Sequence, residues 1–313
     1  MKKQIMGMTM FIILLAAVSL VSIISCGEMD LYAAARVPLP GEDGLPKEKT
    51  LFYVEGQQLW GAPLADATNQ LAGEQYFSEP LLQDAKSIQI HKATASIYWC
   101  SGEGIYRKKA SGSGMVETII KRSSGDMIIT FVIDSKNSRL FFIHLMNTNE
   151  ILKAPLEPNT NATALNVSGA AQQMISDIAF DPNEGPNGSI VWLNNQNVPA
   201  MRRVCKFALD GIGQELYSPP DVDLQKLALM PPDIFFYYNN GTGWLTRVNY
   251  NMTTEPINPV PNIFPNDMVA DPETRHLYFA KGGEIIRYNV DNRTDTPVRT
   301  EPNTVTALCV YYL

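Results

Sequence analysis

A six-residue motif recurs along this chain at intervals of 40 to 53 residues, and this repetition restricts the fold more than any other feature. Each copy reads apolar, any, basic, any, any, apolar, with Gly61 in the basic position of the first copy. The copies begin at residues 59, 105, 151, 204, 245 and 285. Repeats of this length that are rich in short strands are typical of β-propellers, in which four-stranded sheets surround a central channel. The sequence therefore predicts an all-β, six-bladed β-propeller.

An apolar-aromatic triplet precedes each copy by 8 to 14 residues. The triplets are Leu51-Phe52-Tyr53, Ile97-Tyr98-Trp99, Leu140-Phe141-Phe142, Ile190-Val191-Trp192, Ile234-Phe235-Phe236 and Leu277-Tyr278-Phe279. Such residues favour strands, and the Gly and Asn residues that follow them favour tight turns, so triplet and basic motif predict a β-hairpin. Upstream segments ending in Asp, such as 132–134 and 268–271, predict a further strand. Because successive residues of a strand face opposite sides, both aromatic positions should be buried between neighbouring blades.

The first repeat lacks this upstream strand, because residues 33–49 are rich in Pro, Gly and charge. The end of the chain contains a matching segment, Val305-Thr306-Ala307-Leu308-Cys309-Val310. We therefore expect the C-terminal strand to pair with the N-terminal blade and to close the ring. Closure removes the unpaired sheet edges that an open ring would leave.

The order of an upstream Asp, an aromatic pair and an apolar-any-Arg-any-any-Leu-Asp-Gly motif resembles the YWTD (class B) repeats of LDL-receptor-type six-bladed propellers. Segments 97–107 and 206–211 match most closely, and the resemblance covers about residues 50 to 313. All six copies replace the Thr-Asp of that family, for example with Cys100-Ser101, and four cysteines cannot build its flanking EGF-like modules. The resemblance implies the propeller fold and leaves the ligand open, because function depends on the loops.

The N-terminus carries the features of an export signal. Lys2 and Lys3 precede an uncharged apolar stretch over residues 5–25, so residues 1–26 predict either a signal peptide or a lipoprotein leader. The segment 23–27 resembles the lipobox of bacterial lipoproteins, in which Cys26 would be lipid-modified. Residues 27–49 would then form a flexible tether that leads to the propeller at 50–313.

A second signal favours a glycosylated eukaryotic secreted protein instead. Asn-X-Ser/Thr acceptors occur at Asn161, Asn166, Asn187, Asn240, Asn251 and Asn292. Both interpretations predict a domain outside the cytoplasm, either secreted or lipid-anchored at the cell surface. The net charge of −7 (25 basic against 32 acidic residues) and the lack of a basic run disfavour nucleic-acid binding. Membrane contact is expected only through an N-terminal lipid or an uncleaved leader.

The sequence contains few of the residues that metal and nucleophile chemistry requires. It has three histidines, His91, His144 and His276, and none has a nearby Cys or His partner at zinc-ligand spacing. The three cysteines after the leader, Cys100, Cys205 and Cys309, fall on predicted strands, which favours buried free thiols. The alternative is a disulfide between two of these three cysteines, and the sequence does not assign the pair. We therefore predict neither a metal nor another cofactor.

The turns between aromatic and basic strands should gather on one face of the ring, around the mouth of the channel. The candidate ligand-binding residues in these turns are Glu55, Glu103, His144, Asn194, Tyr238 and Lys281. The link between Asn194 and Met201, which contains Pro199, is the longest and marks a recognition loop. These features predict a non-catalytic binding module for an extracellular protein or glycan. The alternative is a calcium-dependent, lactonase-like propeller hydrolase with Glu55, Glu103 and Asn194 at the channel.

Overall fold

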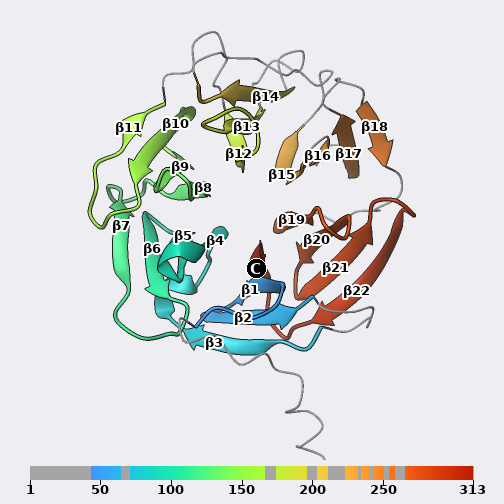
Figure 1. Cartoon of the computed structure of the whole chain (residues 1–313), viewed down its shortest axis with the longest axis horizontal. Coiled ribbons are helices and arrows are strands. Elements are labelled where there is room, and N and C mark those ends of the chain that lie inside the picture. Colours follow the sequence, from blue (N-terminus) through green and yellow to red (C-terminus); the bar gives the residue numbers. More distant parts are fainter. Residues whose placement is uncertain are drawn as a thin grey trace, which may run out of the picture. The chain divides into compact units, whose positions relative to one another are not determined.

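The computed structural model describes residues 44–64, 71–165, 174–195, 203–210, 223–231, 234–239, 243–249, 254–257 and 265–312. Within them, 23 β-strands form six antiparallel sheets that surround an axis (Figure 1). The predicted leader with Cys26, most of the predicted tether, Asn166, Asn240, Asn251 and Pro199 lie outside the described residues. The described chain is a six-bladed β-propeller, as the repeat predicts.

Five sheets have four strands, and within the described residues the fourth sheet has three. From the axis outward, blade 1 contains β23 (Val305–Tyr311), β1 (Thr50–Glu55), β2 (Gln58–Pro63) and β3 (Glu74–Ser78). Blade 2 contains β4 (Ser87–His91), β5 (Ser96–Ser101), β6 (Gly104–Lys109) and β7 (Glu117–Lys121). Blade 3 contains β8 (Ile128–Asp134), β9 (Arg139–His144), β10 (Asn147–Pro155) and β11 (Thr163–Ala164).

The second half of the ring repeats this order. Blade 4 contains β12 (Ile175–Asp181), β13 (Ser189–Asn194) and β14 (Arg203–Ala208). Blade 5 contains β15 (Leu224–Met230), β16 (Ile234–Asn239), β17 (Trp244–Asn249) and β18 (Thr254–Ile257). Blade 6 contains β19 (Asp267–Asp271), β20 (His276–Lys281), β21 (Glu284–Asn289) and β22 (Thr294–Thr300). Two short 3-10 helices, η2 (Pro80–Leu82) and η3 (Lys92–Thr94), flank β4.

The C-terminal strand closes the ring, as expected from the missing first strand of the first repeat. β23 pairs antiparallel with β1, with Val310 opposite Leu51 and Leu308 opposite Tyr53. It also lies against the first strands of both neighbouring blades, β19 and β4. The first strands thus form an unbroken inner ring, and blade 1 is built from both ends of the described chain (Figure 1).

The hydrophobic core lies between the blades, and the aromatic triplets supply much of it. Tyr98 packs in the cluster shared with blade 3, whereas its neighbour Trp99 packs in the cluster shared with blade 1. Phe141 and Phe142 divide in the same way between blades 4 and 2. All four side chains are fully buried. This confirms the prediction that alternate residues of the second strand serve two different inter-blade interfaces.

The two ends of the ring have different turns. We call one end of the ring the upper face. It carries the turns between the second and third strands of each blade, and the first strands begin there. The lower face carries the turns between first and second strands. Buried aspartates hold those lower turns: Asp134 accepts hydrogen bonds from the Asn137 amide at 3.2 Å and from the Arg139 guanidinium at 2.7 Å. The upstream aspartates seen in the sequence are therefore turn residues.

The basic residue of the repeated motif has a structural role in the copy that begins at residue 105. Arg107 donates to the carboxylate of Glu117, directly opposite on β7, and to the carbonyl oxygen of Leu156 in blade 3 at 3.1 Å. Its guanidinium thus joins two blades, because Glu117 belongs to its own blade and Leu156 follows β10 of blade 3.

Candidate functional site

The six candidate residues from the sequence lie on the upper face, one in each blade. Glu55, His144, Asn194 and Lys281 end the second strands of blades 1, 3, 4 and 6. Tyr238 is the last residue but one of β16, and Glu103 lies in the turn between β5 and β6. The expectation that these turns share one face therefore agrees with the sheet topology.

The environments of these residues differ from those of open ligand-binding side chains. Glu55 is buried, and its Oε1 accepts hydrogen bonds from the backbone amide and the Nδ2 of Asn303 at 3.0 and 2.8 Å. Asn303 belongs to the connection from blade 6 to blade 1, so Glu55 holds two blades together. Asn194 and Tyr238 are also buried, whereas Lys281 is half-buried. The ends of second strands pack under the neighbouring inter-blade connections, and this packing is not visible in the sequence.

Glu103 differs because its carboxylate is not buried. Its Oε1 accepts the amide of Gly125 at 2.9 Å, and its Oε2 lies 3.3 Å from the Lys121 ammonium. The hydrogen bond from the Gly125 amide, together with that from Lys121, holds the pKa of Glu103 below its usual value. Glu103 thus fastens the turn of blade 2 to the connection that leads into blade 3.

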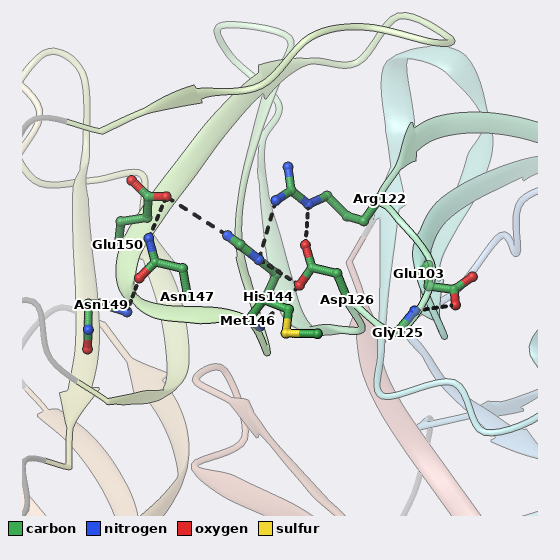
Figure 2. Close-up of polar contacts among 9 residues, drawn as sticks. All are labelled: Glu103, Arg122, Gly125, Asp126, His144, Met146, Asn147, Asn149 and Glu150. Atoms are coloured by element: carbon green, nitrogen blue, oxygen red, sulfur yellow. Dashed lines mark hydrogen bonds and ion pairs between the residues drawn. The ribbon is translucent and has the colours of Figure 1, made fainter.

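His144 lies at the centre of a charged cluster beneath the tip of blade 3 (Figure 2). The ring is 3% exposed, and its Nδ1 lies 2.8 Å from Oδ1 of Asp126, which is 2% exposed. Asp126 also accepts hydrogen bonds from the Met146 amide at 3.1 Å and from Arg122 Nε at 2.8 Å. Although burial acts in the opposite direction, the hydrogen bonds from His144, Met146 and Arg122 hold the pKa of Asp126 below its usual value.

The other ring nitrogen of His144 faces a second acid. Its Nε2 is buried without a hydrogen-bond partner and lies 4.0 Å from Oε1 of Glu150. That same oxygen accepts a hydrogen bond from Asn147 Nδ2 at 2.8 Å (Figure 2). Register is lost in β10 between Asn147 and Leu152, so Glu150 belongs to a bulge. His144 therefore lies between two carboxylates, one bonded to it and one just beyond hydrogen-bonding distance.

Above this cluster, four large apolar side chains are exposed on the upper face. We call the set the upper-face patch: Met127, Leu145, Met146 and Met174, with exposed fractions of 42%, 52%, 70% and 42%. Backbone amides of the patch make hydrogen bonds that hold it in place. The Leu145 amide donates to the Met127 carbonyl oxygen at 2.7 Å, and the Met174 amide donates to Asn149 Oδ1 at 3.0 Å. Sequence reasoning missed this patch, although an apolar Leu-Met pair in a tight hairpin turn was a visible signal.

A groove of about 540 Å³ continues from Met174 toward blade 5. Its wall combines apolar and amide or hydroxyl side chains, including Ile129, Thr148, Met174, Asn195 and Gln225. Asn195 bridges blades 4 and 5, because its Oδ1 accepts the Leu224 amide at 2.9 Å and its Nδ2 donates to the Leu224 carbonyl oxygen. The upper face of blades 3 to 5 therefore offers apolar surface beside polar groups on a braced backbone.

The central channel contains a second polar group of residues. Five of the six first strands have a polar residue at the same register position: Ser87, Thr130, Asp177, Lys226 and Asp267. Ala307 occupies this position on β23. Asp177 accepts the Leu227 amide of the next blade at 2.8 Å, and Asp267 accepts the Leu308 amide of the next blade at 2.8 Å. Lys226 lies between them, with its Nζ 3.6 Å from Asp267. Burial raises the pKa of Asp177 to about 6.

This layer lines a narrow cavity. The cavity has a volume of about 190 Å³, and Ser87, Thr130, Asp177 and Asp267 contribute to its wall. Residues about 40 to 50 positions apart meet here because each blade contributes one first strand to the axis, so no local motif marks the site in the sequence.

Other sequence predictions have the following outcomes. Cys100, Cys205 and Cys309 are buried free thiols, as favoured. Asn161 and Asn292 are exposed and Asn187 is half-buried. Among the described residues, no three His, Cys, Asp or Glu side chains lie close enough to hold a metal ion. In the same part of the chain, no helix is long and apolar enough to cross a membrane.

No protein-family model matches the sequence, and no curated protein matches it significantly. Solved structures do match the fold. A chain of the nidogen/laminin complex superimposes with a TM-score of 0.65 at 13% identity, covering 84% of this chain and 98% of that one. TolB from Acinetobacter baumannii has a TM-score of 0.62 at 13% identity, covering 90% and 70%. The gluconolactonase XC5397 from Xanthomonas campestris has a TM-score of 0.58 at 13% identity, covering 71% and 78%. At such identities these likenesses show the fold alone.

Proposed function

We propose that this protein is a non-catalytic binding module that works outside the cytoplasm and recognises a protein partner through its upper face. The observation that carries the proposal is the upper-face patch, whose four members are 42% to 70% exposed. Leu145 and Met146 form the turn of blade 3, Met127 accepts a hydrogen bond from that turn, and the Met174 amide binds Asn149 of β10. Exposed apolar patches bordered by polar residues are characteristic of protein interaction sites, and methionine adapts its shape to a partner. Apolar surface of this kind favours a protein over a glycan as the ligand.

The backbone beneath the patch supports this function. Asp126 holds the Met146 amide, and Asn149 holds the Met174 amide, so the tip is braced before a partner arrives. Bracing of a loop reduces the entropy lost on binding. The likeness to a chain of the nidogen/laminin complex is consistent with a protein-binding propeller, and the YWTD-type resemblance would make this chain a divergent member of that group.

The path of the chain suits display of the upper face. Lys49, which precedes β1, lies on the lower face, where its Nζ is 2.9 Å from Asp271 and 3.1 Å from Glu273. A leader over residues 1–26, with lipid on Cys26 or cleaved as a signal peptide, would therefore leave the upper face directed away from the point where the chain enters the ring. Leu45, within the stretch assigned to the tether, is buried against blades 1 and 2, so a free tether would end before it.

Differential capture tests the proposal. Wild-type residues 44–313 and the variants Met146→Asp and Met174→Asp are immobilised and exposed to the extracellular proteins of the source cells. A carboxylate in the patch should abolish capture of a specific protein, because a buried unpaired charge is strongly unfavourable. Met115→Asp is the matched control, since Met115 is 89% exposed and lies in the link between β6 and β7, outside the patch. Equal capture by all four proteins, or by none, would refute a binding role for the patch.

The alternative, a calcium-dependent lactonase-like hydrolase, has one observation in its favour: the charged layer of Asp177, Lys226 and Asp267 beside the channel cavity. Purified protein would be assayed with simple lactones, with calcium and with a chelator. Turnover that requires calcium and is lost in Asp267→Asn, while Met146→Asp retains it, would replace the binding module with this enzyme.

A further inference from the structure

The His144 cluster has a geometry that responds to protonation. Hydrogen bonding to the Asp126 carboxylate requires a proton on Nδ1, so the neutral ring presents an unshared electron pair at Nε2. This nitrogen is buried without a donor and faces Oε1 of Glu150 at 4.0 Å, so two acceptors oppose each other there. A second proton on the ring would convert this contact into an attraction between an imidazolium donor and a carboxylate.

We propose that His144 is a protonation-sensitive latch that sets the shape of the upper-face patch, so that acidification changes the affinity of the protein for its partner. The inference rests on the proposed function for its consequence at the partner, but the latch itself is a property of this chain alone. Histidine is the side chain whose ordinary titration range lies closest to neutral pH.

The contacts around His144 explain how its protonation would reach the patch. On one side, Asp126 Oδ1 binds both His144 Nδ1 and the Met146 amide. On the other side, Glu150 lies in the β10 bulge that also contains Asn149, and Asn149 Oδ1 binds the Met174 amide. Movement of Glu150 toward the ring would therefore shift the bulge that holds Met174, while Met146 stays anchored. Asp126 thus connects the ring to Met146, as Figure 2 shows, and Asn149 connects the bulge to Met174.

The charges that face the ring favour such a response. Asp126 and Arg122 approach it from the connection between β7 and β8, and Glu150 approaches it from β10. Arg122 Nη2 lies 3.5 Å from His144 Nδ1, but the guanidinium is paired with Asp126 through its Nε at 2.8 Å. Lys121, which ends β7 ahead of this connection, is paired with Glu103 at 3.3 Å. Two carboxylates and one paired cation thus surround the imidazole.

Methyl NMR tests the latch without any partner. Methionine methyl groups labelled with carbon-13, together with the His144 ring signal, are followed from about pH 8 to about pH 5, the range in which imidazole groups titrate. We expect the Met146 and Met174 methyl signals to shift with the same midpoint as the ring. His144→Asn, whose amide retains a donor toward Asp126, should lose these shifts. Glu150→Gln should lose the shift of Met174, because the carboxylate that a protonated ring would attract is gone.

His91→Asn is the matched control. His91 is also 3% exposed, but it lies on the lower face with its Nδ1 on the Thr94 hydroxyl at 2.8 Å, so this variant should keep the shifts of Met146 and Met174. Absence of pH-dependent shifts in the wild type, or their persistence in His144→Asn, would overturn the latch. Loss of partner capture in Met146→Asp is scored separately, so failure of the binding proposal is distinguishable from failure of the latch.

Discussion

At the residue scale, the upper face is held by acids that are buried and hydrogen-bonded, and Asp126 is the clearest of them. Its carboxylate accepts hydrogen bonds from His144, the Met146 amide and Arg122, and its pKa lies below the usual value. A carboxyl group with a lowered folded-state pKa stabilises the fold above its unfolded pKa of about 3.9, and this contribution is lost as the pH falls through the folded value.

Asp126→Asn should therefore lower the free energy of unfolding by about 1.5–3 kcal/mol at neutral pH, the usual magnitude for hydrogen bonds to a charged group. The difference from wild type should begin to shrink below about pH 4, where the unfolded chain takes up the proton, and it should disappear as the pH falls through the lowered folded-state pKa of Asp126. Urea unfolding at a series of pH values measures this. A difference that stays constant down to acidic pH would show that the carboxylate charge has no role at this position.

Asp177 should behave in the opposite way, because burial raises its pKa to about 6. A carboxyl group whose pKa is raised in the folded state contributes stability that is complete below its unfolded pKa of about 3.9. This contribution is lost as the pH rises from there through the folded-state pKa. Asp177→Asn loses one of two backbone hydrogen bonds, from the Ile178 or Leu227 amide, but has no charge to bury. We expect it to be less stable than wild type near pH 4, and we expect this difference to narrow as the pH rises from about 4 to about 6. A gap that widens with pH would contradict this assignment.

At the element scale, the repeated hairpin is a local unit, whereas β23 acts over the whole ring. Its residues Val305, Leu308, Val310 and Tyr311 are buried, and it lies against β1, β4 and β19. Buried side chains of this size contribute about 1.5–3 kcal/mol each, which together is comparable to the entire stability of a typical domain, about 5–15 kcal/mol.

Deletion of residues 304–313 should therefore abolish cooperative unfolding near room temperature, as measured by circular dichroism and calorimetry. A peptide of residues 304–313 added in trans should restore it in a concentration-dependent way. Deletion of Leu313 alone, which lies beyond β23, is the control and should leave the transition close to that of wild type. A truncated ring with an unchanged transition would mean that closure by β23 is dispensable.

At the scale of the whole molecule, the proposed function assigns separate tasks to the two faces. The chain enters at the lower face, where Lys49 pairs with Asp271, and the upper-face patch lies at the other end of the blades. Protein attached to a surface through a tag placed ahead of residue 44 should thus bind its partner as well as protein in solution. A bulky insertion between Leu145 and Met146 should eliminate binding. Surface plasmon resonance measures partner binding by the attached protein and by the insertion variant. Loss of binding on N-terminal attachment would contradict the proposed display.

The sequence by itself determined the architecture, because each blade is a local hairpin unit whose strand pattern and turn residues recur six times. Even the closure could be predicted, since segment 305–310 matched the one missing strand. The sequence also predicted that the turns with the candidate residues share one face of the ring, but it did not predict the environments of these residues. Glu55 and His144 are buried because the connection from a neighbouring blade covers each of them, and Asp177, Lys226 and Asp267 meet because successive blades place their first strands side by side. Those contacts join residues that are far apart in the chain, so only the tertiary structure decided them.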